Sequence, residues 1–515
     1  MARNQVDTVA AIDVGTNSIR MLIAEIDPSG RTTPLDELWK PTDIGRDTFV
    51  KKRVAADSIH ETCDTLKGFV GLMRDYRVRR YRAVSTSGIR EAENREYVLE
   101  QIRLRTGLTV EVINQAEERF LVYKALRDQL PEFGTMSDAG TLVANIGMGG
   151  VEVSVYSEGH LKFTDYIKIG SLRLRKILAD LEPVSLDFSG IMREFVESRI
   201  HFLEPHIRGI PIQYFIGLGD EIRTISNIYG GPKSSGNSIV IPKQSLQSLY
   251  EAIRGITTDR VTEQYQLHRN EAEVLLPSLI IFNHLMDMTG AQAIHAPLVT
   301  LRQGILADLV DDIFDTSRKH DFIHDIITSV WYIAEKYKVE KEHSAYIEWI
   351  ALTIFDQTWR IHRLGNRERL YLNVAAILHD IGKYVNATQH DVQSHNVIRS
   401  QDIMGFSNRE MRIIANLARY HSDEVPQPSH DNYRLLNEQD KIMVSKLVAV
   451  LKLAEALDLS HSQKIKDLSI VTAGRELHFK LKLEGDFMLE QWNFENVSRF
   501  FEEVMGYRPV IKRKG

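Results

Sequence analysis

The chain has 515 residues, 43% of them hydrophobic and 26% charged, and its 64 basic and 70 acidic residues leave a net charge of −6. This length predicts about three domains, and the near-balanced charge argues against a general attraction to nucleic acid or anionic membranes. The single cysteine, Cys63, excludes an internal disulfide. No secretory signal precedes the first predicted strand, and the longest apolar segment, 274–288, is too short and too polar to span a bilayer. We therefore expect a cytoplasmic protein.

The predicted elements change in kind along the chain. Up to about residue 312, apolar strands such as 9–14 and 213–219 alternate with helical patterns, which is typical of α/β domains. From about residue 320 the apolar spacing is helical throughout, and the tail from 466 alternates apolar and polar residues around a turn. The loop 230–238 is predicted to be flexible from its composition. The sequence thus predicts two α/β domains at 1–136 and 137–312, a helical domain at 313–465, and a small α+β domain at 466–515.

Both α/β domains contain a strand, a glycine loop and a second strand. Asp13 and Gly15 of the first loop correspond to Asn145 and Gly147 of the second. Glycine lets a backbone approach phosphate closely, and the N–H groups of such a loop can bind phosphate oxygens. One such loop is equally consistent with an ordinary hairpin. Two loops, about 130 residues apart, predict two related halves that close around a phosphate chain.

Four motifs, in order, resemble the exopolyphosphatase / guanosine pentaphosphate phosphohydrolase (Ppx/GppA) family of the actin-like phosphotransferase superfamily. They are AIDVGTNSIRMLIAEI (11–26), STSGIREAEN (85–94), VINQAEERF (112–120) and NIGMGGVEV (145–153). A fifth segment, LRQGILADL (301–309), resembles the closing helix of the family's second domain. The resemblance covers about residues 6–310. It implies two actin-like (ribonuclease H-like) domains that form a cleft, and hydrolysis of phosphoanhydride bonds.

The resemblance also implies roles for individual residues. Glu117 aligns with the family's catalytic glutamate and would act as general base on water, with Glu118 as the alternative. Arg90 would grip phosphate oxygens with its guanidinium group. Without the resemblance, both glutamates could be solvated acids in the first turn of a helix. The other implied ligands are Gly15, Thr16, Asn17, Gly147, Gly149 and Gly150 for phosphate, and Asp13, Asn145 and Glu152 for Mg²⁺.

The second phosphate motif departs from the family pattern, which usually reads Asp-Ile-Gly-Gly-Gly-Ser-Thr-Glu. Asn145 replaces the acid, and Gly150 and Val151 replace the two hydroxyl residues. An asparagine can ligate a metal through its carbonyl oxygen but supplies no charge, so we expect weaker Mg²⁺ binding. The segment GLGDEIR (217–223) also lacks the family's usual Gly-Gly-Thr.

Histidines and carboxylates of the helical region resemble, in their order, the ligands of the HD phosphohydrolase superfamily. That order is one His, a His-Asp pair, two further His and a final Asp. Imidazole and carboxylate together suit Mn²⁺, Fe, Zn²⁺ or Mg²⁺, and paired metals can activate a bridging water. A vestigial site of structural histidines is the alternative. By this resemblance the metal ligands would be His343, His379, Asp380 and Asp458, with His395 and His421 completing a second site.

Together these features predict a metal-dependent hydrolase that releases terminal phosphate from inorganic polyphosphate, with pppGpp as a second substrate. One alternative places the chemistry in the HD-like site, as a nucleotide phosphohydrolase, and leaves the actin-like half to bind phosphate. Another is a non-catalytic sensor of polyphosphate or of a guanosine polyphosphate. We expect no nucleic-acid or membrane partner, and the resemblance implies a homodimer.

Overall fold

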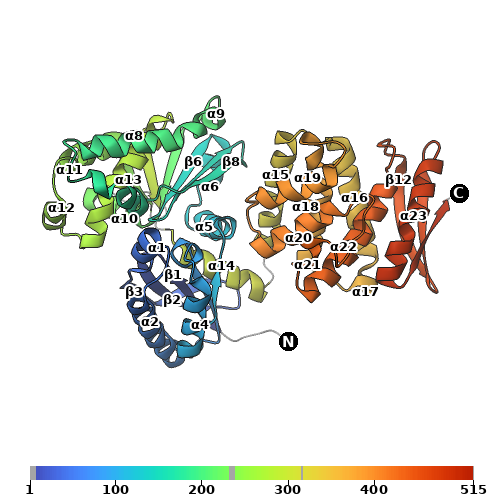
Figure 1. The fold of residues 1–515 in the computed structure, drawn as a ribbon, viewed down its shortest axis with the longest axis horizontal. Helices are drawn as coiled ribbons and strands as arrows, with labels where there is room; N and C mark the ends of the chain where they lie inside the picture. Colours follow the sequence, from blue (N-terminus) through green and yellow to red (C-terminus); the bar gives the residue numbers. More distant parts are fainter. Residues whose placement is uncertain (1–6, 231–237, 298, 315–316, 514–515) are drawn as a thin grey trace. The chain divides into compact units, whose positions relative to one another are not determined.

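Two mixed β-sheets organise the N-terminal part of the chain in the computed structural model, which describes residues 7–230, 238–297, 299–314 and 317–513. The chain divides into two units, Met1–Phe322 and Ile323–Gly515, which we call the N-terminal and C-terminal units (Figure 1). Most of the predicted loop 230–238 lies outside the described residues. Across the described residues, no helix combines the length and the apolar character that a membrane crossing requires.

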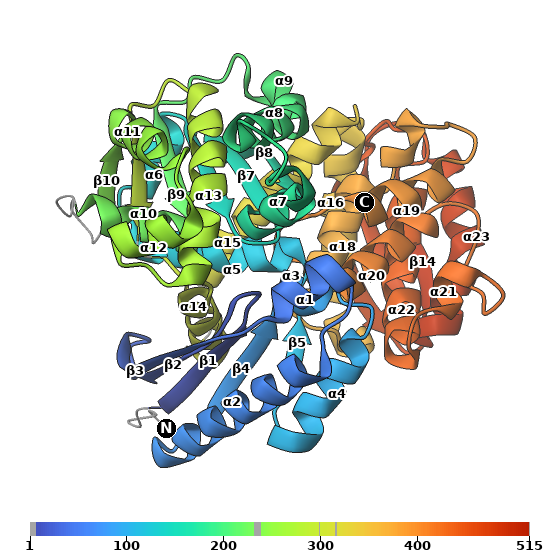
Figure 2. The same ribbon diagram turned by 60° about the vertical axis from the view of Figure 1, so that its left-hand side comes forward.

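The first lobe of the N-terminal unit has a five-stranded sheet in the order β3-β2-β1-β4-β5. Strands β1 to β3 are antiparallel neighbours, whereas β4 and β5 run parallel to β1. Helices α2 and α4 cover one face of this sheet (Figure 2). The strands are β1 Asp7–Val14, β2 Ser18–Ile26, β3 Thr32–Pro41, β4 Arg80–Ser85 and β5 Val110–Val112, and the helices are α1 Ile44–Lys51, α2 Ala56–Asp75, α3 Ser87–Arg90, α4 Arg95–Thr106, α5 Gln115–Gln129 and α6 Phe133–Asp138.

The second lobe repeats this topology in a six-stranded sheet, in the order β10-β11-β9-β6-β7-β8. Its meander β6–β7–β8 matches β1–β2–β3, and β9 and β11 run parallel to β6 as β4 and β5 do to β1. The strands are β6 Thr141–Ile146, β7 Val151–Ser157, β8 His160–Ile167, β9 Tyr214–Leu218, β10 Ser238–Pro242 and β11 Ala293–Pro297, and the α-helices are α7 Ser171–Ile177, α8 Phe188–Ile200, α9 Glu204–Ile207, α10 Asp220–Tyr229, α11 Lys243–Ile253, α12 Thr258–Tyr265 and α13 Arg269–Asp287.

Helix α14, Leu301–Phe314, follows the second lobe in sequence but packs on the first. Its apolar residues Ile305, Leu306 and Val310 share a buried cluster with Val9 and Leu22 of the first sheet. The predicted boundary at residue 312 placed this helix in the second domain. The hydrophobic effect instead buries its apolar stripe on the free face of the first sheet, so the helix closes the first lobe.

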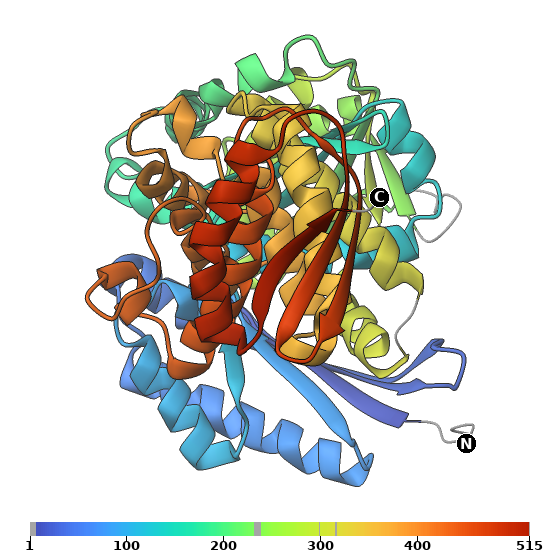
Figure 3. The ribbon, with the colours of Figure 1, turned by 90° about the vertical axis from the view of Figure 1, so that its right-hand side faces the viewer.

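The C-terminal unit is a helical bundle followed by a three-stranded sheet. Helices α16, α18, α20 and α22 pack against one another, and α23 packs on α22 and β14. The sheet β12-β13-β14 lies beside α23 (Figure 3), with Phe479 and Phe494 in edge contact. The elements are α16 Lys341–Gln357, α17 Trp359–His362, α18 Asn366–Leu378, α19 His390–Ser400, α20 Asn408–Arg419, α21 Asp431–Arg434, α22 Glu438–Ala456, β12 Ile465–Ala473, β13 Glu476–Leu483, α23 Met488–Met505 and β14 Arg508–Arg513, and α15 Ser317–Lys336 runs across the division between the units.

Candidate functional site

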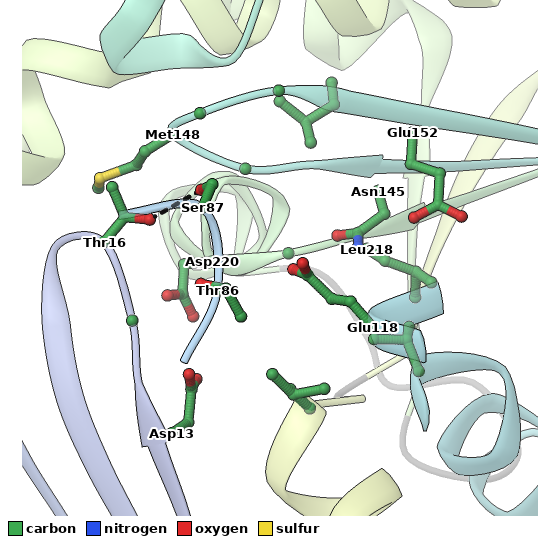
Figure 4. Close-up of a pocket in the computed structure, with 18 of the residues that line it drawn as sticks. Asp13, Thr16, Thr86, Ser87, Glu118, Asn145, Met148, Glu152, Leu218 and Asp220 are labelled. Carbon is green, nitrogen blue, oxygen red and sulfur yellow. Dashed lines mark hydrogen bonds between the residues drawn. The ribbon is translucent and has the colours of Figure 1, made fainter. Parts of the chain in front are cut away.

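A cavity of about 160 Å³ lies where the two glycine loops face each other in the N-terminal unit (Figure 4). Its walls come from the β1–β2 and β6–β7 loops, the start of α5, and the start of α10 and α14. The predicted cleft residues that line it are Asp13, Gly15, Thr16, Asn17, Arg90, Asn145, Gly147, Gly149, Gly150 and Glu152. The structure therefore brings the predicted residues of both loops to one cavity.

Each loop is closed by a backbone hydrogen bond across its glycines. In the first loop Gly15 N donates to the Ser18 carbonyl oxygen at 3.0 Å, and in the second Gly147 N donates to the Gly150 carbonyl oxygen at 3.0 Å. A Cβ added at Gly149 would lie 2.6 Å from Ser87 Oγ, so only glycine allows this close approach. The two loops thus present backbone to the cavity, as phosphate binding requires.

Asp13 has the environment of a cation ligand. It lines the cavity, and its buried Oδ1 has no hydrogen-bond partner among the residues that the structure describes. Burial is the main reason that its pKa is raised to about 6, against the opposing effect of Arg302 and Arg20. A divalent cation would compensate this buried charge, because hard oxygen ligands suit Mg²⁺.

Glu152, the other predicted carboxylate, has a different environment. It is almost fully buried, and its Oε1 lies 3.2 Å from Nε of Arg119 on α5. Its charge is therefore balanced by the protein. The residues fit Mg²⁺ best at Asp13, and less well at Glu152.

The two candidate bases lie in different places: Glu118 lines the cavity, and Glu117 caps helix α5. Glu117 belongs to the capping box of α5: its backbone N–H donates to Asn114 Oδ1 at 2.7 Å, and its Oε2 accepts from Asn114 N at 3.0 Å. Glu118 instead lines the cavity, and Figure 4 shows its side chain reaching into the pocket. Consecutive helical residues point about 100° apart, so the capping of one acid directs the next into the cleft.

Arg90 is held at the same wall. Its Nη1 donates to the Ile113 carbonyl oxygen at 2.8 Å and to Glu118 Oε2 at 3.1 Å. Its Nε is buried, and within the described part of the chain it has no hydrogen-bond partner. A buried, unpaired guanidinium N–H is costly, and a phosphate oxygen would satisfy it.

Several cavity residues were not predicted from the sequence. Arg302, on α14, is buried, and no described residue forms a hydrogen bond with its Nε. Arg20, on β2, pairs with Asp220 across the two lobes. Arg20 lies in the first phosphate motif and Arg302 in the segment that resembles the closing helix, so a basic residue within a family motif was the available signal. Ser87, Tyr166 and Glu221 also line the cavity and were not predicted either.

The C-terminal unit gathers a second group of ionisable side chains. His343, His379 and Asp380 offer ligand atoms within 4.8 Å of one another, as do Asp380, His390 and His421. Asp380 links the two groups: Oδ2 lies 3.5 Å from His379 Nε2, and Oδ1 lies 3.5 Å from His421 Nε2. Imidazoles and carboxylates converging in this way can hold a divalent metal.

Two predicted ligands are not placed as expected. Asp458 Oδ2 lies 2.9 Å from Nδ1 of His343, and Glu455, one helical turn earlier, lies 3.4 Å from Nε2 of the same ring. Glu455 therefore joins the cluster, whereas Asp458 contacts the other nitrogen of the His343 ring. Although burial lowers it, contact with Asp458 and Glu455 raises the pKa of His343 to about 9.

His395 also lies apart from the cluster. Its Nδ1 is 3.4 Å from Asn396 Oδ1, and it belongs to none of the groups of convergent ligands among the described residues. His390, five residues earlier in the sequence, meets His421 instead, with 3.2 Å between their Nε2 atoms. The order of histidines in the sequence did not reveal that His390, at the start of α19, would join the cluster in place of His395.

Residues 22–313 match the model of the Ppx/GppA phosphatase family. The chain belongs to this family. Residues 327–496 match its domain III, so the Ppx/GppA assignment extends into the C-terminal unit. This confirms the resemblance found in the sequence motifs.

The curated relatives include both an exopolyphosphatase and guanosine-5'-triphosphate,3'-diphosphate pyrophosphatases. Exopolyphosphatase 2 of Mycobacterium tuberculosis is 26% identical over 292 residues, which cover 54% of this chain and 89% of that protein. Guanosine-5'-triphosphate,3'-diphosphate pyrophosphatase of Vibrio atlanticus is 22% identical over 425 residues, 81% of each chain. The corresponding protein of Pseudoalteromonas translucida is 20% identical over 494 residues, 94% of this chain and 93% of that one.

Solved structures match about 60% of the chain. The Ppx/GppA family member of Aquifex aeolicus has a TM-score of 0.51 and 24% identity, covering 60% of this chain and 99% of that one. An exopolyphosphatase from Cytophaga hutchinsonii has a TM-score of 0.54 and 21% identity, covering 60% and 98%. The predicted two-lobed, actin-like α/β fold is thereby confirmed for this family member.

Proposed function

We propose that the N-terminal cleft hydrolyses phosphoanhydride bonds, releasing terminal phosphate from inorganic polyphosphate, with pppGpp as a second substrate. The observation that carries this proposal is the convergence of Glu118, Arg90 and Asp13 on one cavity between two glycine loops. The names of the relatives, exopolyphosphatase and guanosine-5'-triphosphate,3'-diphosphate pyrophosphatase, support both substrates.

The geometry assigns a task to each group. The N–H groups of the two loops and the free Nε of Arg90 bind oxygens of the terminal phosphate. Glu118 orients a water against the phosphorus and accepts its proton. Asp13 would hold Mg²⁺, which when bound supplies positive charge to the phosphate oxygens. The departing phosphate oxygen remains close to arginine side chains of the cleft, which stabilise its charge.

A second cavity, of about 780 Å³, supports guanosine pentaphosphate as a substrate. It shares Asn17, Arg20 and Arg302 with the phosphate cleft. Trp39 lines it, 56% exposed, in edge contact with His268 at 6.1 Å between ring centroids. An exposed aromatic ring beside a phosphate site offers a surface on which a purine can stack.

Substitution of the two adjacent glutamates tests the site. Glu118→Gln keeps the shape of the side chain but removes the base, so kcat on polyphosphate should fall by about 100-fold or more. Glu117→Gln should retain most activity and lose at most about 1 kcal/mol of stability, since it alters only the helix cap. Phosphate release from polyphosphate and pppGpp with Mg²⁺ measures both. An inactive Glu117→Gln beside an active Glu118→Gln would refute the assignment.

A second candidate function is a metal-dependent phosphohydrolase in the C-terminal unit, with an HD-like arrangement of ligands. The cluster around Asp380 favours it. His343, His379, Asp380 and Glu455 would hold one divalent metal, and His390 and His421 a second beside Asp380. Mn²⁺, Fe or another divalent metal suits these ligands, and when bound it would supply an activated water.

Metal content tests this second site directly. His379→Ala should lose bound Mn²⁺ or Fe, because it removes a central ligand from the cluster. His395→Ala is the matched control and should keep it, since His395 lies outside the cluster. Elemental analysis of the purified proteins after metal loading gives the result. Equal metal content in the wild type and in His379→Ala would exclude this cluster.

Two further proposals complete the functional description. Following the family resemblance, we expect a cytoplasmic homodimer, and light scattering of the full chain should give twice the mass of one chain. Tight binding of polyphosphate without turnover by the metal-loaded wild type would favour the sensor alternative over both hydrolase proposals.

A further inference from the structure

Tyr166, on β8, occupies the space beside the second glycine loop where a side chain of residue 150 would project. A Cβ added at Gly150 would lie 2.3 Å from both Cζ and Oη of Tyr166. Such a distance is far inside van der Waals contact. The Tyr166 ring must therefore move if residue 150 carries a side chain.

Strand register directs Tyr166 to the cleft side of the second sheet. Tyr166 lies opposite Glu152 in the β7–β8 pair, and Glu152 lies opposite Asn145 in the β6–β7 pair. Directly paired residues share a face of a sheet. All three side chains line the cavity that also contains Arg90 and Glu118.

The hydroxyl of Tyr166 is available to a ligand. No hydrogen bond of this hydroxyl is found among the described residues, and the charges of Arg90, Glu118, Glu91 and Arg173 act on it. Burial raises the pKa of Tyr166 above its ordinary value, so the hydroxyl keeps its proton and can donate. Because Tyr166 lines the cavity, its hydroxyl can donate to a ligand that enters there.

We propose that the Tyr166 hydroxyl contacts the substrate, donating a hydrogen bond to a phosphate oxygen in the cleft. It would supply from β8 the hydroxyl that the glycine loop lacks at position 150. The ligand chemistry is that of a phosphoanhydride chain, and the proposal rests on the proposed function of the cleft. It accounts for the glycine at 150 and the tyrosine at 166 together.

Removing the hydroxyl alone tests the contact. Tyr166→Phe keeps the ring in place, and one hydrogen bond to a charged phosphate corresponds to roughly a 10- to 100-fold loss of kcat/KM. Tripolyphosphate titrated into Glu118→Gln and Glu118→Gln/Tyr166→Phe isolates binding from turnover, and the double variant should bind at least about tenfold more weakly. Tyr97→Phe, on the exposed face of α4, is the matched control and should behave as the wild type.

Exchanging the two positions tests whether they share one role. Gly150→Ser alone should lose activity, because its Cβ collides with the Tyr166 ring. In a Tyr166→Ala background the ring is absent, so a serine at position 150 fits and places a hydroxyl in the cleft from the glycine loop. The double variant should recover at least about tenfold of the activity that Tyr166→Ala loses.

The outcomes separate this proposal from the proposed function. Wild-type activity and tripolyphosphate binding in Tyr166→Phe, with an inactive Glu118→Gln, would overturn the role of Tyr166 and leave the cleft assignment intact. No recovery in the exchanged variant would also overturn it. An active Glu118→Gln would instead refute the function on which the proposal rests.

Discussion

Asp13 and Asn145 hold matching positions in the two glycine loops, but their surroundings differ. Asp13 Oδ1 is buried without a hydrogen-bond partner, whereas Asn145 lies directly opposite Glu152 in the β6–β7 pair. An aspartate at 145 would place two carboxylates face to face, which is unfavourable without a cation between them. The amide therefore fits a second loop whose acid, Glu152, is balanced by Arg119. The uncompensated charge of the cleft remains at Asp13.

Glu221 provides a prediction at the scale of one residue. Burial, together with neighbouring Asp220, raises its pKa from 4.5 to about 7, so between these values the folded chain binds more protons than the unfolded chain. Stability should consequently fall as pH rises through this window. Glu221→Gln removes this titrating group. The free energy of unfolding of the variant should therefore exceed that of the wild type by about 1–3 kcal/mol at pH 8 and equal it near pH 4.

Urea unfolding in metal-free and phosphate-free buffer measures this difference. Ser171, whose hydroxyl donates to Glu221 Oε1 at 2.7 Å, can make the same bond to glutamine. Ser171→Ala therefore serves as a control that alters the hydrogen bond but keeps the acid. Parallel pH profiles for the wild type and Glu221→Gln would show that this carboxyl does not titrate as expected.

At the scale of elements, the start of α5 shows how local sequence can settle a role. The pattern Asn114-Gln-Ala-Glu117 has the spacing of a capping box, and this spacing assigns Glu117 to the helix cap. The capping pattern was visible in the sequence, but alignment to the family motif favoured Glu117 as the base. Because the Glu117 side chain caps the helix, the next side chain, Glu118, points into the cleft.

The arrangement of the two glycine loops cannot be predicted from the secondary-structure elements alone. The strand–loop–strand pattern of each loop follows from apolar strands interrupted by glycine. Their opposition in one cavity depends on contacts between the lobes, such as Arg173 of α7, which donates to the Gly149 carbonyl oxygen at 2.6 Å and to both carboxylate oxygens of Glu91. The register of the β7–β8 pair likewise places the Tyr166 side chain against Gly150. The spacing of these residues in the sequence does not predict that they are in contact.

At the scale of the whole molecule, the two candidate sites lie in different units of the chain. The phosphate cleft lies within Met1–Phe322, and the histidine cluster lies within Ile323–Gly515. Each unit has its own core and its own set of ionisable groups. The two proposed functions can therefore be separated by substitution.

We predict that His379→Ala leaves polyphosphate hydrolysis within about twofold of the wild type, because domains with separate cores tolerate local changes independently. Glu118→Gln should abolish this hydrolysis and keep the metal content of the wild type. Both variants are assayed on polyphosphate, pppGpp and a panel of nucleotides. Loss of every activity in His379→Ala alone would move the chemistry to the C-terminal unit.

The sequence by itself determined the two-lobed α/β design, the paired glycine loops and the helical region that follows, since these depend on local periodicity and on motifs read in order. Only the tertiary structure decided that α14 closes the first lobe, that Glu118 faces the cleft, and that Glu455 and His390 join the histidine cluster. The reason is physical. Strand register, helix rotation and side-chain burial bring together residues far apart in the chain, and these follow from packing between elements.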